Sequence, residues 1–427
     1  MIERIINIIK KHDDVKAYSI FEQKSSSAEL YYVLDKLETN RLVDTVDYRV
    51  TIFKEFENDM LGQATVGISL SYTDKDIENK INEAILRTAL SQNKKYELPK
   101  GTKFSSKSES NILKENLNEI ALKVSDAIYA SKKYKDGWIN SAEIFVTKID
   151  NHLINSLGCD ATYEKAKLFI EIIPTWTGEK EEVEIYFSFE KSEIDYEEIT
   201  NKVDELLINA KSRAEALNMP KNINKINVIF GPEMISNIAH YFKTNLDYST
   251  KFNHTSVIEV GEDLSKDNPC KLDVTLKPVI KELPDSTPFD MDGIILKEVK
   301  IIENGIAKNL AGSTKFGQYL NVKEPTGSIP LVELKNGEYT FKDLTKDPYL
   351  YCVSFSSPQL DPFSGYYGGE VRLAYYFDGK NTYPVTGLSI SGILKEDFTK
   401  IKLSKEIDTF ANYKGPKYLL VPNMTIN

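Results

Sequence analysis

Histidine side chains are the first residues to consider, because they could bind a metal or transfer protons. The chain has His12, His152, His240 and His254, and none has a second histidine close to it in sequence. A zinc site needs three or four convergent ligands, so a single histidine is weak evidence for one. We therefore interpret His240 as a partly buried helix residue and His254 as an exposed residue of a polar loop.

Two carboxylates, Asp290 and Asp292, could act as an acid/base pair or hold a cation. They lie in the turn Asp-Met-Asp-Gly at residues 290–293, where Asp and Gly are favoured for their backbone geometry. We prefer this turn interpretation. Cys352 lies in an apolar run, where a cysteine is more often a small core residue than a nucleophile. No catalytic residue is assigned from these side chains.

Four tyrosines, Tyr366, Tyr367, Tyr375 and Tyr376, form an aromatic run near the end of the chain. A strand that has a free edge and tyrosine side chains can bind an extended peptide, which then adds to the sheet as one more strand. Aromatic residues are also common in ordinary β packing. These four tyrosines are candidate residues of a peptide-binding groove.

The segment 289–327 must position the acidic turn. An apolar strand is predicted over residues 294–302, and Asn304-Gly305 follows it. Asn-Gly readily takes positive φ at both centres of a tight turn, so the segment predicts a hairpin. A short helix is expected around residues 315–320. The pattern is that of a strand, a turn, a second strand and a helix.

Hydrophobic periodicity divides the chain into three units, and the fold class predicted is α+β. Residues 1–110 are expected to form an N-terminal α/β unit that ends in a polar linker or mobile loop at residues 98–110. Residues 111–220 predict a central α/β unit with clear helices at its start and end. Strands with frequent Gly and Pro predict a β-rich domain over residues 221–427.

Composition indicates an ordinary globular protein. A net charge of −10 over 427 residues argues against direct nucleic-acid binding, which needs Lys and Arg to displace phosphate counterions. The three cysteines are far apart, which favours a reducing compartment. Neither a signal peptide nor a membrane span is seen, so we expect a cytoplasmic protein without membrane contact.

Several motifs together resemble those of the TldD/PmbA family. Phe-Asp-Met-Asp-Gly at residues 289–293 resembles the family's F-D-x-[DE]-G phrase, and Asn-Ser-Leu-Gly at residues 155–158 its N-S-x-G phrase. Residues 361–366 and 383–392 resemble two late loops of the family, and the resemblance runs from about Arg49 to the C-terminus. It implies a cytosolic protein associated with peptide maturation, metalloprotease activity and modulation of DNA gyrase.

The resemblance also implies where a metal site would be, and this chain departs from it. Active members carry H-E-x-x-x-H on a helix, in which two histidines bind zinc and the glutamate is the base. When the motif is matched through Gly-Pro at residues 231–232, His240 stands at the position of the first histidine. Tyr241 then stands at the position of the glutamate, and Asn245 at that of the second histidine. The family's late cysteine is also missing from residues 412–417. No resident cofactor is therefore expected.

Three hypotheses follow. The first is a catalytically silent, PmbA-like partner of a TldD-like metalloprotease that processes unfolded peptides, in a heterodimer or homodimer. The second is an active metallopeptidase with rearranged zinc ligands, drawn from His240, His254, Glu233, Asp290 and Asp292. The third is a stand-alone peptide-binding homodimer.

Overall fold

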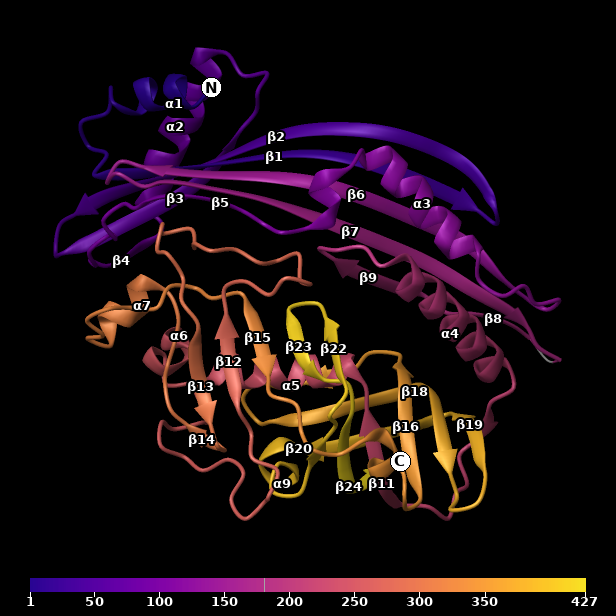
Figure 1. Cartoon of the computed structure of the whole chain (residues 1–427). Coiled ribbons are helices and arrows are strands. Elements are labelled where there is room, and N and C mark those ends of the chain that lie inside the picture. Colours follow the sequence, from indigo (N-terminus) through magenta and orange to yellow (C-terminus); the bar gives the residue numbers. More distant parts are fainter. Residues whose placement is uncertain (180) are drawn as a thin grey trace.

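The computed structural model describes residues 1–179 and 181–427. In it, a long N-terminal sheet arches over a second layer formed by the C-terminal half of the chain (Figure 1). Within the described ranges, no helix is long and apolar enough to cross a membrane.

The N-terminal layer is one nine-stranded sheet. Its strands are β1 (Ala17–Val33), β2 (Lys36–Phe56), β3 (Met60–Ile68), β4 (Gln92–Lys94), β5 (Lys103–Lys107), β6 (Gly137–Asn155), β7 (Asp160–Thr177), β8 (Glu182–Glu184) and β9 (Phe187–Lys191). The order is β4-β3-β2-β1-β6-β7-β5, and β8 and β9 also pair with β7. Because β1 pairs with β6 and β5 with β7, the sheet joins residues on both sides of position 110.

One expectation for this region is corrected. Residues 98–110 were expected to be a linker or mobile loop, but they contain β5, which pairs in parallel with Asp160 to Glu164 of β7. The segment Lys-Phe-Ser-Ser-Lys at residues 103–107 is too short and too polar for its pattern of side chains to indicate a strand. The partner strand, which lies more than fifty residues further along the chain, supplies the hydrogen bonds that make it one.

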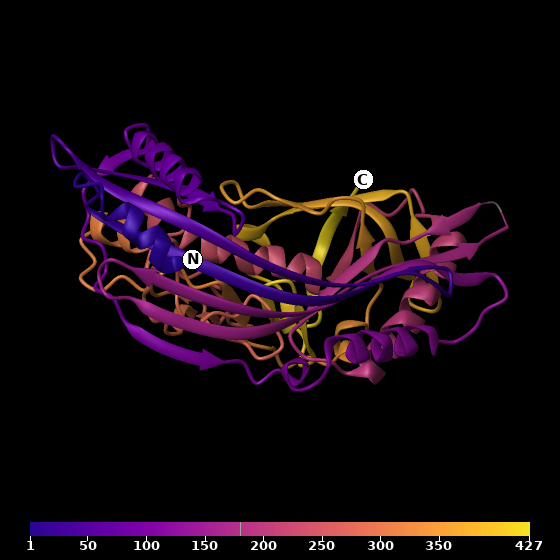
Figure 2. The same ribbon diagram turned by 90° about the horizontal axis from the view of Figure 1, so that it is seen from above.

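Helices cover one face of this sheet. They are α1 (Ile2–Ile9), α2 (Asp74–Thr88), the 3-10 helix η1 (Asn111–Lys114), α3 (Leu117–Tyr129) and α4 (Tyr196–Ala214). Side chains alternate between the faces of a strand, so Ile20 and Leu30 of β1 point to the same face. Ile20 packs in the core with α1 and α2, and Leu30 packs in the core with α3 and α4. Seen from above, the two helix groups lie toward opposite ends of the long strands (Figure 2).

The C-terminal half holds two further sheets. One contains β10 (Leu217–Asn218), β11 (Lys225–Phe230), β16 (Tyr349–Phe355), β17 (Gln359–Leu360), β18 (Tyr366–Phe377), β19 (Thr382–Thr386), β20 (Leu388–Ile393), β21 (Lys402–Leu403) and β24 (Leu419–Ile426). The other contains β12 (Val274–Lys277), β13 (Val299–Glu303), β14 (Ile306–Ala307), β15 (Leu331–Leu334), β22 (Ile407–Phe410) and β23 (Tyr413–Pro416). Their orders are β10-β19-β18-β16-β11-β24-β20, with β17 and β21 at its sides, and β14-β13-β12-β15-β23-β22.

Five helices belong to this half: α5 (Pro232–Asn245), α6 (Tyr248–Phe252), α7 (Thr314–Tyr319), α8 (Phe341–Leu344) and α9 (Leu394–Asp397). Side chains of α5, among them Ile235 and Phe242, join residues of both sheets in the largest hydrophobic core. The predicted hairpin is confirmed, since Asn304 and Gly305 have φ of 50° and 81° between β13 and β14. Helices on one sheet and a strand-rich second half confirm the α+β class.

Candidate functional site

Helix α5 carries the three positions of the expected metal motif, His240, Tyr241 and Asn245. Strand β11 ends just before it, Gly231 is the N-cap, and Pro232 begins the helix. Proline is favoured there because its missing N–H would have no partner in the first turn. All three positions therefore lie on one rigid helix whose start is set by local sequence.

Asn245 is completely buried, and both polar atoms of its side-chain amide make hydrogen bonds. Its Nδ2 donates to the carbonyl oxygens of Tyr241 at 3.0 Å and Pro362 at 2.8 Å. Its Oδ1 accepts from the backbone N–H of Val257 at 2.9 Å. The residue therefore fastens the end of α5 to two loops, and no polar atom is left for a metal.

Tyr241, which the resemblance matches to the glutamate of the expected motif, is only 3% exposed. Its hydroxyl lies beside the loop at residues 361–365, since a Cβ atom on Gly365 would be 3.4 Å from it. Burial, followed by the charges of Glu262 and Asp361, raises the pKa of Tyr241 to about 12. A phenol with this pKa stays protonated near neutral pH and cannot take a proton from water.

His240 is half-buried on the same helix. Burial and the neighbouring Lys243 ammonium lower the pKa of His240 to about 4, so its imidazole is neutral near pH 7. Burial also lowers the pKa of Lys243 to about 8, and its Nζ donates to the carbonyl oxygen of Pro330 at 2.6 Å. His240 is thus the one side chain of the three motif positions with the chemistry of a metal ligand.

The zinc that the resemblance implies does not fit these residues. At the three positions matched by the resemblance, the chain has one neutral imidazole, a buried phenol and a buried amide. Zinc in proteins is held by three or four Cys, His, Asp or Glu side chains. In the part of the chain that the structure describes, no three such side chains are grouped closely enough to hold a metal ion.

In the described part of the chain, the structure likewise does not group the side chains of the second hypothesis, in which rearranged residues would bind zinc. His254 is exposed in the loop after α6, with a left-handed φ of 56°. Asp290 instead organises its turn, since its oxygens accept from the backbone N–H groups of Asp292, Ile294 and Ser328, each at 3.0 Å. Asp292 is part-buried beside it, and burial followed by the charge of Asp290 raises the pKa of Asp292 to about 6. The Asp-Gly turn interpretation describes these contacts well.

The four candidate groove tyrosines do not form one surface. Tyr366 is 49% exposed, whereas Tyr367 is fully buried and donates to Asp397 Oδ2 at 2.8 Å. Tyr375 contacts α4, with its hydroxyl 3.1 Å from Asn209 Oδ1 and 3.0 Å from Ser212 Oγ. Tyr376 is half-buried and packs against the C-terminal core.

Their strand, β18, is also an inner strand. It pairs with β16 and β17 on one side and with β19 and β20 on the other. Its backbone therefore offers no free edge to an incoming peptide, and strand addition at these tyrosines is ruled out. The aromatic composition indicated a strand correctly, but the pairing that removes its edge depends on distant segments.

Two motif segments that the sequence singled out meet across the two layers. The turn at residues 155–159 is held by Asn155 Oδ1, which accepts from Leu157 and Cys159 N–H groups at 2.9 Å each. A Cβ atom on Gly293 would lie 2.8 Å from Cys159 Sγ, so the second turn packs directly on the first. These motif residues hold the layers together.

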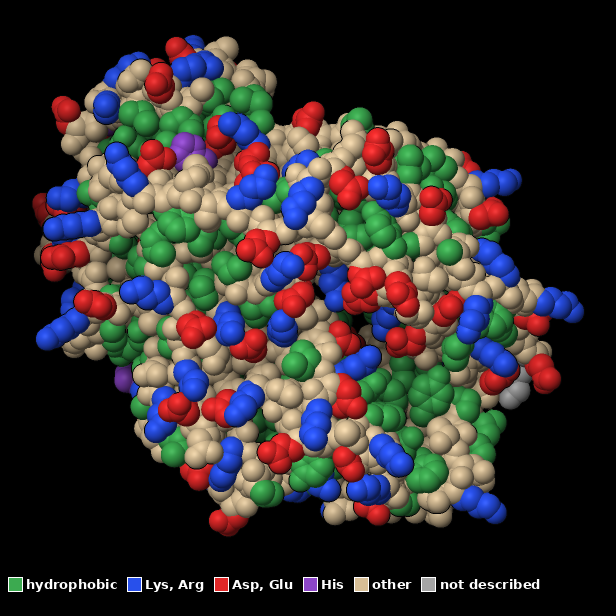
Figure 3. All heavy atoms as spheres, in the orientation of Figure 1, with side chains coloured by type: hydrophobic (Ala, Val, Ile, Leu, Met, Phe, Trp, Pro, Cys, Tyr) green, Lys and Arg blue, Asp and Glu red, His purple; other side chains and the backbone are tan. Residues whose placement is uncertain are grey.

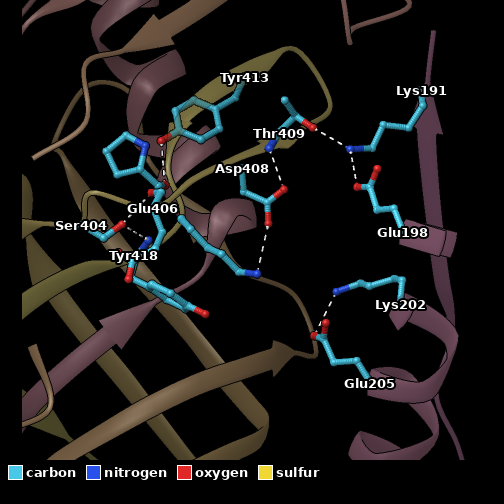
Figure 4. Close-up of polar contacts among 12 residues, drawn as sticks. Lys191, Glu198, Lys202, Glu205, Ser404, Glu406, Asp408, Thr409, Tyr413 and Tyr418 are labelled. Carbon is cyan, nitrogen blue, oxygen red and sulfur yellow. Dashed lines mark hydrogen bonds and ion pairs between the residues drawn. The ribbon is translucent and has the colours of Figure 1, made fainter. Parts of the chain in front are cut away.

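The sequence analysis did not indicate the residues that make polar contacts between the two layers. Charged side chains of both signs are mixed over the face of the molecule that includes this boundary (Figure 3). Lys191 of β9 reaches across to Thr409 Oγ1 of β22 at 3.0 Å and pairs with Glu198 at 3.0 Å (Figure 4). No motif spacing could have identified this contact, because its partners are 218 residues apart.

The comparisons with known proteins agree with this architecture. Residues 223–427 match the family described as the PmbA/TldA metallopeptidase C-terminal domain. No curated protein matches the chain in sequence. The fold is similar to that of TldE from Thermococcus kodakarensis, with a TM-score of 0.80, 17% identity, and 100% of this chain and 99% of that chain covered.

Two further crystal structures have the same fold. A proposed modulator of a DNA gyrase from Thermotoga maritima gives a TM-score of 0.79 at 17% identity, covering 100% of this chain and 99% of that chain. One from Bacteroides thetaiotaomicron gives 0.77 at 12% identity, covering 100% and 97%. The fold and the match of residues 223–427 define a domain of the type found in PmbA/TldA metallopeptidases. Residues 223–427 thus carry a domain of the TldD/PmbA type, as the motifs predicted.

Proposed function

We propose that this chain is a catalytically silent, PmbA-like subunit that acts in the cytoplasm beside a TldD-like metalloprotease in the processing of unfolded peptides. The observation that carries the proposal is Asn245. Where active members are expected to have a zinc-binding histidine, this chain has a buried amide whose hydrogen bonds hold α5 to two loops. The position serves structure, so hydrolysis is left to a partner.

The first experiment measures metal in the purified protein by mass spectrometry, after equilibration with zinc and dialysis. We expect less than stoichiometric zinc in the wild type and the same content in His240→Ala, because one imidazole does not make a zinc site. Zinc near one per chain, lost in His240→Ala, would contradict the proposal and support the metallopeptidase with rearranged ligands.

The second experiment measures association with the TldD-like paralogue of the same organism by light scattering after size exclusion. A one-to-one complex, with peptidase activity that disappears when the paralogue's own histidines are replaced, is the expected result. If the two proteins do not associate and this chain forms only a homodimer that binds peptide, the stand-alone peptide-binding function replaces the proposal.

A further inference from the structure

One face of the N-terminal sheet carries an aromatic row that no helix covers in the described part of the chain. In β6 and β7 the residues that point toward the helices, such as Val146 and Ile170, are fully buried. Phe145 and Phe169 point to the opposite face, as does Tyr31 of β1, and all three are half-buried. Ring centroids lie 5.5 Å apart for Tyr31 and Phe145 and 5.4 Å for Phe145 and Phe169.

Two glutamates of like charge lie beside this row. Glu143 of β6 and Glu171 of β7 are directly opposite each other in the register of the sheet. Burial, followed by the charge of Glu171, raises the pKa of Glu143. Like charges directly opposite in an antiparallel pair are destabilising. Among the described residues Glu171 accepts one hydrogen bond, from the Tyr186 hydroxyl at 2.9 Å, and neither glutamate has an ion-pair partner.

The cations at the two ends of the row are already neutralised. Arg41 of β2 pairs with Glu29 at 2.5 Å and donates to the Tyr31 hydroxyl at 2.7 Å. Lys167 of β7 pairs with Glu190 at 2.5 Å. The face therefore presents aromatic rings and two carboxylates without an ion pair, and the charge of Arg41, which already pairs with Glu29, only partly opposes the rise in the pKa of Glu143.

The edge of the sheet beside this face is also open. Strand β2 pairs with β3 only from Tyr48 to Phe56, so the outer side of residues 36–47 has no neighbouring strand in the described structure. Leu42, which lies opposite Ala28 and so on the helix-bearing face, is 70% exposed in this stretch. A long exposed strand edge is a ready template for association. At this end of the sheet, one face is therefore not covered by a helix, and the edge of β2 is not paired with another strand in the described structure.

We propose that this face binds a second, different protein that places a lysine or arginine between Glu143 and Glu171 and an apolar group over the row Tyr31–Phe145–Phe169. Charge complementarity selects the occupant. A second copy of this chain would bring a net charge of −10, and the cations on its own copy of this face are paired. Nucleic acid is excluded because its phosphates would meet the two carboxylates.

The test uses isosteric variants of the full chain. Glu143→Gln combined with Glu171→Gln removes the like-charge pair and keeps the shape of the face. The matched control, Glu57→Gln combined with Glu119→Gln, removes the same charge from exposed residues elsewhere. The probe is the purified TldD-like paralogue, so this arm rests on the proposed function. We expect the Kd to rise by about tenfold or more for the first variant and to stay unchanged for the control.

If the wild type and both double variants bind the paralogue equally well, this inference is overturned and the proposed function stands. If the wild type does not bind the paralogue, the proposed function fails, and a second probe decides the inference. That probe is the capped peptide Arg-Trp-Arg, compared with Glu-Trp-Glu. A rise in Tm caused by Arg-Trp-Arg alone, and lost in Glu143→Gln/Glu171→Gln, supports the inference, and an equal response of wild type and variant overturns it.

Discussion

Asn245 shows how one buried amide can anchor the end of a helix. An imidazole at the end of α5 would direct a nitrogen lone pair to a metal, whereas the amide satisfies two carbonyl oxygens and one N–H group. Each bond joins α5 to a different neighbour or stabilises its last turn. The residue anchors α5, so its replacement should lower the stability of the fold.

Asn245→Ala should destabilise the fold by about 3 kcal/mol, because a buried N–H and a buried carbonyl oxygen lose their partner. Urea unfolding followed by circular dichroism measures the change. Asn237→Ala, on a less buried position of the same helix, is the control and should change stability by less than about 1 kcal/mol. Equal effects of the two variants would contradict the anchoring role.

Asp292 should make the protein less stable as pH rises. Its folded pKa is raised from 3.8 to about 6, so between these values the folded state binds more protons than the unfolded state. Stability from this group is therefore complete below pH 3.8 and is lost as pH rises through 6. Asp292→Asn should gain up to about 3 kcal/mol over the wild type at pH 7.5, and little at pH 4.

Chemical denaturation of both proteins at the two pH values measures this difference. Asp290 is unsuitable for the same substitution, because its carboxylate accepts three backbone N–H groups that an amide nitrogen could not serve. A gain for Asp292→Asn that is equal at both pH values would show that its charge is not the cause.

At the scale of elements, the contact of β3 with α2 depends on a glycine. A Cβ atom on Gly62 would lie 2.3 Å from the carbonyl oxygen of Thr88, at the end of α2. A backbone atom cannot swing away as a side chain can, so the helix or the strand would have to shift. The absence of a side chain at this position sets how closely the helix approaches the sheet.

Gly62→Ala should therefore cost about 2 kcal/mol or more, as overpacking does. Gly67→Ala is a matched control in the same strand, because a Cβ atom there meets nothing within 4 Å. The control should be neutral or stabilising by about 0.5 kcal/mol. The measurement is thermal unfolding of both variants, and similar Tm values would refute this close-approach argument.

At the scale of the whole molecule, a few buried polar contacts couple the two layers. Lys165 of β7 is part-buried, and its Nζ donates to the carbonyl oxygens of Pro284 at 2.8 Å and Ser286 at 3.3 Å. Burial lowers the pKa of Lys165. Both acceptors precede the acidic turn at residues 290–293, so this lysine ties the N-terminal sheet to the turn.

Lys165→Met should leave the two carbonyl oxygens without a donor and loosen the segment 284–290. We expect faster amide hydrogen exchange there, equivalent to about 1–2 kcal/mol of lost local stability, measured by mass spectrometry. Lys107→Met removes an exposed lysine paired with Glu164 and serves as the control. Unchanged exchange at 284–290 in Lys165→Met would show that the coupling lies elsewhere.

Much of the local structure could be predicted from sequence, because it depends on short-range chemistry. The capping box of Thr73 and Asp76, three residues apart, begins α2, and Asn304-Gly305 makes the predicted hairpin. Helix α4 follows the apolar spacing that indicated it. Strand β1 was not predicted, because the run Ser25-Ser26-Ser27 interrupts its apolar pattern.

The sequence by itself determined the main helices, the turns and the family resemblance, since each depends on residues a few positions apart. Only the tertiary structure decided that Asn245 is an anchor, that β18 has no free edge, and that residues on both sides of position 110 share one sheet. These features depend on partners tens to hundreds of residues away. Strand pairing and side-chain burial depend on which distant segments contact each other, and a local sequence pattern does not contain this information.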